Sequence, residues 1–300
     1  MKLLIAGATG LIGTALVEEC LGLGIEVHYL TTNKNKIETK KAYRGFYWNP
    51  SEGIMDKEAF KGVTSIINLA GSPVARRWTS SCKKEILNSR KEPAWLIFNT
   101  LKELKHSVTH YISASGISIY PSSPVQLYDE NAKEKATTFL GKVVVEWEKA
   151  ADRFTELHIK VAKVRTGIVL SHENGTLLHM AKPIKMGFGA YLGNGEQWQS
   201  WIHVDDIVGI YLYLLKKELS GVYNAVSPSP VSNKKMMQLI AQQFNKSIWL
   251  PNVPKFLLRI LLGKMATIAF ESQLVSSEKI LKEGFQFQYV NLENALEDLL

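Results

Sequence analysis

Three glycines, spaced three residues apart, separate an apolar run from a helical pattern at the start of this chain. Residues 2–6 read Lys-Leu-Leu-Ile-Ala, as in a buried strand, and Gly7, Gly10 and Gly13 follow at once. Residues 11–23 then repeat apolar positions at helical spacing. Because glycine allows backbone angles that a Cβ forbids, the pattern predicts a sharp turn where the backbone comes close to another group.

The rest of the first half repeats this alternation of apolar runs and helix-length segments. Apolar, β-branched runs lie at residues 25–30, 64–70, 108–115 and 159–170. Strands of this kind are typical of a parallel sheet that is covered by helices on both faces. The pattern therefore predicts an α/β fold with a Rossmann-like doubly wound parallel sheet, built from right-handed crossovers.

The alternation of apolar runs and helix-length segments becomes irregular in the second half, where we expect a smaller lobe. Residues 185–201 are rich in glycine, which disfavours a helix, whereas residues 228–244 carry a helical pattern. We expect residues 1–170, with parts of 200–228, to form the sheet domain. Residues 171–300 should mainly form a small C-terminal α/β lobe over the strand ends, where doubly wound proteins bind ligands.

Composition and charge narrow the class of protein. The net charge is +8, but the densest basic stretch, residues 33–44, is interpreted mainly as a solvated lysine-rich loop because no nucleic-acid-binding motif accompanies it. Cys20 and Cys82 do not suggest a disulfide framework and favour the cytoplasm. The apolar start meets glycine too early for a secretory signal, and the run at 256–263 contains Arg259 and is too short for a membrane span. We therefore expect a soluble cytoplasmic protein without nucleic-acid or membrane partners.

The three glycines predict a binding site for a dinucleotide. A turn without side chains lets a pyrophosphate reach the backbone amides, and the following helix directs its free N–H groups at that anion. Gly13 allows the helix to pack closely on the strand, while Thr9 and Ile12 supply amides or a hydroxyl nearby. The spacing differs from the common Gly-x-Gly-x-x-Gly. Nevertheless, the strand before it, the helix after it and the second strand favour dinucleotide binding over a plain tight turn.

The end of the second predicted strand indicates which dinucleotide binds. A carboxylate there would bind the ribose 2′-hydroxyl and repel a 2′-phosphate. This chain instead has Thr31 and Thr32, followed by Lys34 or Lys36 as the source of positive charge, with no carboxylate before Glu38. Because hydroxyls and an ammonium group can bind a phosphate, we favour NADP over NAD.

Short motifs along the whole chain resemble those of a known family. They read GATGLIG, NLAG, RRW, NSR, RTGIVL, QSWIHVDDI and YNAVSPSPVSN, in this order between residues 7 and 233. Together they resemble the epimerase-family branch of the atypical extended short-chain dehydrogenase/reductases, which are NAD-dependent epimerase/dehydratase-like proteins. Some bacterial members carry a cell-division-inhibitor label. The resemblance covers residues 1–300 and is specific for the family, but it does not specify a reaction.

The resemblance implies a set of cofactor-binding residues. Thr31 and Thr32 are expected beside the adenosine ribose, where relatives often have Ser-Arg, so that Lys34 is left to supply the charge. Glu85 and Arg90 match positions that close over the nucleotide, although the sequence alone favours an ordinary exposed helix face for both. The remaining residues are Gly7, Thr9, Gly10, Leu11, Ile12 and Gly13 at the pyrophosphate, Leu69, Ala70 and Gly71 after the run at 64–70, and Val169 near the nicotinamide.

The usual catalytic pair of the superfamily is missing from the sequence. Typical members use Tyr-x-x-x-Lys, in which the lysine and the cofactor lower the tyrosine pKa so that the phenol exchanges a proton while hydride moves. The expected helix, residues 137–151, has Lys142, but Thr138 stands four positions before it. Ser115 and Tyr120 are the remaining candidates, to polarise a carbonyl and to donate a proton. Polar capping of a strand end explains these two residues equally well.

Further polar and aromatic residues are candidates for contacts with a substrate. His203 is a possible acid or base, but we favour a structural interpretation in which the two aspartates that follow it cap a helix. Arg77, Trp198 and Trp201 are expected to line a substrate pocket, with the arginine pairing with an anion and the indoles packing on a ring. The scattered histidines and the absence of a metal-binding motif from the sequence predict that there is no metal site.

Two classes of function fit these observations. The first is an NADP-binding oxidoreductase or epimerase-like enzyme that acts on a small carbonyl or hydroxyl compound, with sugar nucleotides among the candidates. The second is an NADP(H)-binding sensor or scaffold that has lost catalysis. A complete cofactor motif favours the first, whereas the missing Tyr-x-x-x-Lys pair favours the second.

Overall fold

The protein is described by a computed structural model that covers residues 1–173 and 175–300. Strands from both halves of the chain form one mostly parallel sheet, and four long helices pack on it. The strands of the sheet are β1 (Lys2–Ala6), β2 (Glu26–Thr31), β3 (Thr39–Lys40), β4 (Tyr43–Asn49), β5 (Ile54–Met55), β6 (Ser65–Asn68), β7 (His110–Gly116), β9 (Lys160–Thr166) and β13 (Gly221–Ala225). The four helices are α1 (Leu11–Gly22), α2 (Ser80–Glu103), α3 (Phe139–Asp152) and α5 (Val204–Lys217).

The order of the strands defines where the sheet can bind a ligand. The parallel strands follow the order β13-β9-β7-β6-β1-β2-β4, and the short β3 and β5 lie antiparallel to β4. The chain winds outward from β1 in both directions, so the crevice at the carboxyl ends of β1 and β6 is the switch point of the topology. The predicted Rossmann-like doubly wound parallel sheet is confirmed.

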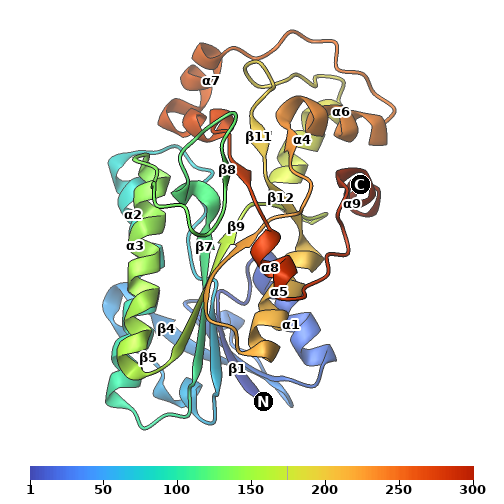
Figure 1. The fold of residues 1–300 in the computed structure, drawn as a ribbon. Helices are drawn as coiled ribbons and strands as arrows, with labels where there is room; N and C mark the ends of the chain where they lie inside the picture. Colours follow the sequence, from blue (N-terminus) through green and yellow to red (C-terminus); the bar gives the residue numbers. More distant parts are fainter. Residues whose placement is uncertain (174) are drawn as a thin grey trace.

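Helices cover both faces of this sheet. α1 and α5 lie on one face and α2 and α3 on the other (Figure 1). Because neighbouring residues of a strand face opposite sides, Leu3 and Ile5 pack in the core under α1 and α5, and Leu4 and Ala6 in the core under α2. β1 is therefore buried on both sides, which explains why it reads as a continuous apolar run.

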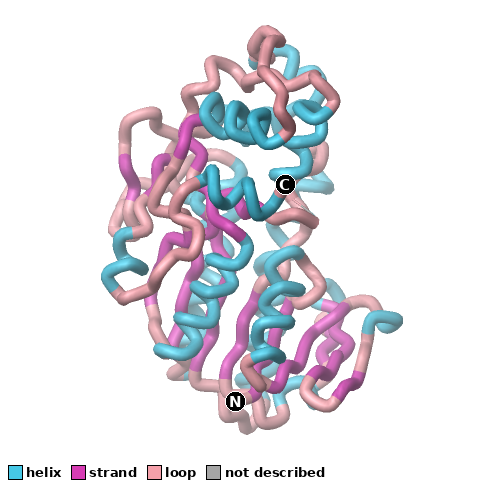
Figure 2. The backbone as a smooth tube through the Cα atoms, turned by 90° about the vertical axis from the view of Figure 1, so that its right-hand side faces the viewer, coloured by secondary structure: helices cyan, strands magenta, loops and turns pink. Residues whose placement is uncertain are grey.

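A layer of helices and loops lies beyond the carboxyl ends of the strands (Figure 2), and most of it comes from the second half of the chain (Figure 1). Helices of this layer pack around a separate apolar core that includes Leu177, Met236, Ile240 and Leu296. Besides α5, the helical elements of the second half are α4 (Thr176–Lys185), α6 (Asn233–Gln243), α7 (Lys255–Leu262), the 3-10 segment η6 (Gly263–Phe270), α8 (Glu278–Lys282), whose Ile280 packs in the core under α1 and α5, and α9 (Leu292–Leu299). Short strand pieces accompany them: β8 (Leu127–Tyr128), β10 (Ile168–Leu170), β11 (Trp198–Gln199), β12 (Trp201–His203), β14 (Val231–Ser232) and β15 (Leu274–Val275).

Two features of the sheet differ from the sequence-based expectation. The lysine-rich stretch was expected to be a loop, but β3 begins within it, and β4 starts at Tyr43 and pairs in parallel with β2. The run at 159–170 is not one strand, because the chain leaves the sheet at Gly167. A Cβ there would lie 2.8 Å from Cγ1 of Val226, so only glycine lets the chain pass and continue as β10, which pairs with β12.

Contacts between segments far apart in the sequence connect the sheet to the elements beyond it. β13, at residues 221–225, returns to the sheet and pairs with β9. A small apolar cluster, built on Trp78, Ile86 and Leu140, packs against Met265 and Ile268 of η6. No helix of the described chain combines the length and the apolar character that crossing a membrane requires.

Candidate functional site

The turn after β1 presses its bare backbone against the end of β6. Gly7 has a φ of +84°, and a Cβ there would lie 2.8 Å from the carbonyl carbon of Leu69. The backbone N–H of Leu69 donates to the carbonyl of Ala6, and the N–H of Ala70 donates to Oδ1 of Asn68. The predicted residues Gly7, Leu69 and Ala70 are thus brought together at the switch point of the sheet.

The first turn of α1 presents free backbone donors beside this contact. Gly10 is the N-cap residue, no side chain of the described residues caps the helix, and its first turn contains no acidic residue. A Cβ on Gly13 would lie 2.8 Å from the Cα of Ala8, so glycine lets α1 lie directly on the turn. Leu11 and Ile12 begin the helix, and Thr9 is exposed in the turn. The positive end of the helix dipole and its unbonded amides form a cradle for an anion.

A cavity of about 560 Å³ opens beside the ends of β2 and β6. Four predicted cofactor residues border this cavity: Thr32, Ala70, Gly71 and Glu85. Glu85 is exposed on α2, and its Oε1 lies 2.8 Å from Nη2 of Arg76. The cavity is large enough for a flat heterocycle with its sugar, and it borders Ala70, whose backbone nitrogen would lie 3.1 Å from a Cβ on Gly7.

The residues at the end of β2 divide into one structural threonine and two exposed groups. Thr31 is buried, and its hydroxyl accepts a hydrogen bond of 3.2 Å from the N–H of Asn33, which shapes the turn. Thr32 and Lys34 are exposed, and Nζ of Lys34 lies 4.7 Å from the centroid of the Tyr47 ring. The hydroxyl and the ammonium group that can reach a ligand here are therefore those of Thr32 and Lys34.

The guanidinium group of Arg90 supports the loop after β6. Its Nη1 donates to the carbonyls of Ser72 (3.2 Å) and Ile86 (3.0 Å), and its guanidinium lies over the Trp147 ring at 5.0 Å. A Cβ on Gly71 would approach Cζ of Arg90 to 3.1 Å. Burial lowers the pKa of Arg90 to about 10. Arg90 therefore holds the loop that borders the cavity.

The other end of the cradle is formed by β10 and the start of α4. Val169 is half-buried in β10, opposite Ile202 of β12. Gly175, the N-cap residue of α4, has a φ of +108°, and a Cβ there would lie 2.9 Å from Cδ1 of Leu11 and 3.9 Å from the carbonyl oxygen of Val169. The predicted residues Leu11 and Val169 thus both lie close to Gly175.

Ser115 and Tyr120 belong to a buried hydrogen-bond network. The Ser115 hydroxyl donates to Oε1 of Glu148 at 2.7 Å. Arg165 donates to both oxygens of the same carboxylate, at 2.8 and 3.0 Å, and its Nη1 donates to the Tyr120 hydroxyl at 2.9 Å. The Tyr120 hydroxyl donates in turn to Oδ1 of Asn224 at 2.7 Å. The network joins β7, α3, β9 and β13.

This network changes the interpretation of the two catalytic candidates. Ser115 is 4% exposed and Tyr120 is 1% exposed, so neither hydroxyl is open to a substrate in this conformation. Burial raises the pKa of Tyr120 to about 12, although Arg165 opposes the shift. Burial would also raise the pKa of Glu148, but the hydrogen bonds and the charge of Arg165 keep that pKa below its ordinary value. The structure therefore assigns both hydroxyls to an ion-pair network, and their proposed catalytic roles have no geometric support.

His203 caps a helix and is not open to a substrate. It is 1% exposed, its Nδ1 accepts the N–H of Asp205 at 3.1 Å, and its ring stacks on Tyr289 at 3.8 Å. The expectation that the aspartates cap α5 is wrong in this detail, since His203 is the cap and Asp206 accepts hydrogen bonds from the backbone at 288–289. His203, Asp205 and Asp298 have ligand atoms within 4.8 Å of one another. Because Nδ1 accepts the N–H of the cap, Nε2 carries the proton in the neutral ring, and it lies 3.2 Å from Oδ2 of Asp298.

The aromatic candidates for substrate contacts lie apart from one another. Trp201 is fully buried in the second apolar core, and its indole N–H donates to the carbonyl of Ser229 at 2.9 Å, so it cannot line a pocket. Trp198 is half-buried and donates to the carbonyl of Pro124 at 3.0 Å, and Arg77 is exposed before α2. The structure therefore corrects the prediction for Trp201.

Residues on β4 that border the cavity, and residues on α3 and β9 that form the buried network, are not among the site residues predicted from the sequence. Trp48 and Asn49, at the end of β4, border the 560 Å³ cavity. The aromatic-rich run at 43–48 is typical of a strand and could have indicated them. Glu148 and Arg165 carry no such signal, because a buried ion pair between a helix and a strand has no spacing of its own in the sequence.

The cradle fits a dinucleotide, which defines the class of protein. Two glycine positions that a Cβ would fill, a helix start without a side-chain cap, and an adjoining cavity all meet at the switch point. Gly7, Gly10 and the first residues of α1 would hold the pyrophosphate, and the cavity beside Thr32 would hold the adenosine. This is the arrangement of a Rossmann-type nucleotide-binding protein.

Comparison with known proteins identifies the family. Residues 3–225 match the NAD dependent epimerase/dehydratase family, and residues 253–299 match a domain of unknown function, DUF1731. An epimerase family protein of Staphylococcus aureus is 33% identical over 300 residues, covering 99% of this chain and 98% of its own length. The chain belongs to the NAD dependent epimerase/dehydratase family, and the resemblance stated from its motifs is confirmed.

Other relatives extend the similarity to plants and to solved structures. An SDR39U1 homolog of the epimerase family in Arabidopsis thaliana is 35% identical over 309 residues, covering 100% of this chain and 87% of that protein. Human epimerase family protein SDR39U1 with NADPH has a TM-score of 0.86 and 27% identity, covering 100% of this chain and 99% of that one. A nucleoside-diphosphate sugar epimerase from Corynebacterium glutamicum has a TM-score of 0.80 and 27% identity, and this chain covers 58% of it. These similarities support an NAD(P)-binding fold with a general oxidoreductase- or epimerase-like role.

Proposed function

We propose that the protein binds NADPH and uses it for hydride transfer with a small carbonyl or hydroxyl compound. The observation that carries the proposal is the cradle at the switch point, where Gly7 and Gly13 bring bare backbone to the start of α1. When bound there, the nicotinamide supplies the hydride chemistry, and the residues of the chain orient it. Val169 on β10 would contact the nicotinamide end, and Thr32 and Lys34 the adenosine end.

The choice of NADP over NAD rests on the charge beside Thr32. Glu38, the first carboxylate after β2, lies 2.6 Å from Nζ of Lys40 and is thereby engaged. Lys34 is exposed and free to approach a 2′-phosphate. The similar human structure that contains NADPH supports the same choice.

We predict that the protein binds NADPH more tightly than NADH, and that Lys34→Glu narrows the difference by about tenfold, since it replaces an attraction to the 2′-phosphate by a repulsion. Calorimetric titration with both cofactors measures the two dissociation constants. Lys41→Glu, at an exposed position between β3 and β4, is the matched control for a general charge effect. Equal affinities of the unchanged protein for the two cofactors would refute the choice of NADP.

The structure also favours a second candidate function, an NADP(H)-binding sensor without catalysis. Ser115 and Tyr120 are buried in the ion-pair network, so they are not available for proton transfer. An enzyme that transfers hydride to or from a sugar nucleotide needs a group beside the nicotinamide that exchanges a proton, and these two hydroxyls do not supply it here. The buried network is the observation that supports the sensor.

Turnover with a deuterium label separates the two candidates. Protein loaded with NADPH deuterated at C4 is incubated with a panel of aldehydes, ketones and sugar nucleotides, and the products are examined by mass spectrometry. We expect deuterium in a product, and we expect Tyr120→Phe to retain most of this activity because its hydroxyl faces Asn224. Tight NADPH binding without label transfer to any compound of the panel would favour the sensor. Loss of transfer in Tyr120→Phe, with the melting temperature unchanged, would return Tyr120 to a catalytic role.

A further inference from the structure

A second cavity lies between the start of α2 and α3 on one side and α7 with η6 on the other. Its volume is about 550 Å³. It shares no described lining residue with the cavity beside Thr32. The two cavities lie on different faces of α2, because Lys84 and Glu85 border the first and Lys83 borders the second. The second cavity is therefore separate from the dinucleotide cradle.

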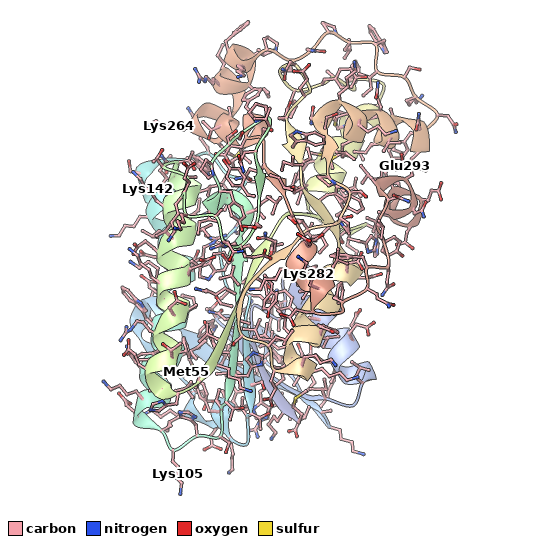
Figure 3. All side chains as sticks on the ribbon, in the orientation of Figure 1. Met55, Lys105, Lys142, Lys264, Lys282 and Glu293 are labelled. Carbon is pink, nitrogen blue, oxygen red and sulfur yellow. The ribbon has the colours of Figure 1, made fainter. Side chains whose placement is uncertain are left out.

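Three cations border this second cavity: Lys83, Arg259 and Lys264. Among the described lining residues there is no carboxylate. In the described part of the chain, the ion pairs closer than 4.0 Å involve other lysines and arginines. Figure 3 shows Lys264 at the same end of the molecule as Lys142, above the start of α3. Cations without carboxylate partners around one hollow create a positive potential that attracts a multiply charged anion.

The wall beneath the cations is apolar and held in place. The rings of Trp78 and Phe139 meet edge to face, with centroids 5.0 Å apart and planes at 70°. The indole N–H of Trp78 donates to the carbonyl of Val74 at 3.0 Å, which fixes the ring. Nζ of Lys83 lies over both rings, 4.8 Å from the Phe139 centroid and 5.6 Å from the Trp78 centroid, so a positive charge directly adjoins this apolar wall. An apolar surface beside a group of cations suits a ligand that carries both an apolar body and an anionic group.

We propose that this cavity binds a small organic phosphate, with its phosphate held by Lys83, Arg259 and Lys264 and its apolar or aromatic body resting against Phe139. A phosphate fits better than a carboxylate because it carries up to two charges and three acceptor oxygens for three cations. The proposal goes beyond hydride transfer, because binding at this site does not depend on any reaction of the cofactor.

Phenyl phosphate is the probe, since it joins an aromatic ring to a phosphate. Its dissociation constant is measured by calorimetry on the full chain saturated with NADPH, with benzoate and benzyl alcohol as the singly charged and neutral analogues. We expect saturable binding of phenyl phosphate, weaker binding of benzoate and none of benzyl alcohol. Lys83→Gln and Arg259→Gln should each weaken phenyl phosphate about tenfold, because each removes a charge-assisted contact.

The matched control is Lys105→Gln, which makes the same charge change at the opposite end of the molecule (Figure 3). It should leave the dissociation constant of phenyl phosphate unchanged. An equal weakening in Lys105→Gln, or no saturable binding by the unchanged protein, would overturn the proposal. The phenyl phosphate titration is also repeated without NADPH. If phenyl phosphate binds only in the absence of NADPH, the two compete for the dinucleotide cradle, and the proposal is overturned. None of these measurements needs turnover, so a protein that transfers no hydride still tests this site.

Discussion

At the scale of single residues, one missing Cβ determines how closely α1 lies on the turn after β1. A Cβ at residue 13 would overlap the carbonyl oxygen of Gly7 and would lie 2.8 Å from the Cα of Ala8. These neighbours are backbone atoms of a tight turn, which cannot rotate away as a side chain can. Relief would require α1 to move, and the cradle would lose its shape with it.

Gly13→Ala should therefore destabilise the protein by about 1–3 kcal/mol, the usual cost of overpacking, and should weaken NADPH binding. The matched control is Gly22→Ala in the last turn of the same helix, where a Cβ would meet nothing within 4 Å. That variant should be neutral or gain about 0.5–1 kcal/mol, because alanine is the better helix former. Urea unfolding and cofactor titration of both variants measure the difference. Equal free energies of unfolding of the two variants would mean that the turn after β1 moves to accommodate the added Cβ at little cost.

A buried carboxyl group gives the protein a pH-dependent stability. Glu271 follows η6 and is half-buried, and burial raises its pKa to about 7 from an ordinary value of 4.5. The folded state therefore holds this proton more tightly than the unfolded state. Its contribution to stability is fully present below pH 4.5 and is lost as the pH rises through 7.

Glu271→Gln should raise the melting temperature by about 2–4 °C at pH 8, where the native side chain is charged, and by less at pH 5. Thermal unfolding at the two pH values measures this difference. Glu297→Gln, at an exposed position of α9, serves as the control and should change the melting temperature equally at both. If Glu271→Gln raises the melting temperature equally at pH 5 and pH 8, the carboxyl group is well hydrated and the prediction fails.

Residues whose partners are near in the chain could be interpreted from the sequence, and those with distant partners could not. Gly7, Gly10 and Gly13 act within one turn, so their spacing predicted their role. Ser115 meets Glu148 thirty-three residues later, and Tyr120 meets Asn224 more than a hundred residues later. No local pattern distinguishes such a hydroxyl from a catalytic one.

At the scale of elements, β9 carries three ion pairs, and two of them lie in contrasting surroundings. Arg165 and Glu148 are buried, with side chains 7% and 9% exposed, and they connect β9 to α3. Lys160 and Glu218 pair at 2.8 Å on the surface, with side chains 53% and 59% exposed. Water solvates the second pair well whether or not it is formed, whereas loss of Arg165 leaves the buried Glu148 carboxylate with the Ser115 hydroxyl but without its cation.

Arg165→Met should therefore cost about 3–5 kcal/mol, because it leaves the Glu148 carboxylate buried without its cation. Lys160→Met on the same strand should cost about 0–1 kcal/mol. Urea unfolding followed by circular dichroism measures both changes. In the double variant Arg165→Met, Glu148→Met, part of the loss should return. If Arg165→Met costs no more than Lys160→Met, the network does not hold α3 to the sheet.

The strand pattern predicted the buried centre of the sheet better than its edge. β1, β6 and β7 read as continuous apolar runs because both of their faces are covered. β4 was missed because lysines precede it and polar residues interrupt it, as at Arg44. The break at Gly167 was also missed, since the apolar run continues through it and only the carbonyl of Ser200 and the side chain of Val226 show that the chain must turn.

At the scale of the whole molecule, the sheet and the elements above it form one connected structure. The small cluster around Trp78 fixes η6 against α2 and α3, and the backbone N–H of Ser123 donates a hydrogen bond to the carbonyl of Ser272. The fold class could be predicted because alternating strands and helices have few possible arrangements. The two cavities could not, because each takes its lining from several separate segments, which lie within residues 32–93 for the first cavity and within residues 78–267 for the second.

The return of β13 to the side of β9 limits how this protein can be divided. A chain that stopped after Leu170 would keep every glycine of the turn but would lose the outer neighbour of β9, leaving a row of amide and carbonyl groups uncovered along that strand. Uncovered rows of this kind recruit other chains and cause aggregation. The two halves of the chain therefore depend on each other, and a fragment that ends at Leu170 is not an independent folding unit.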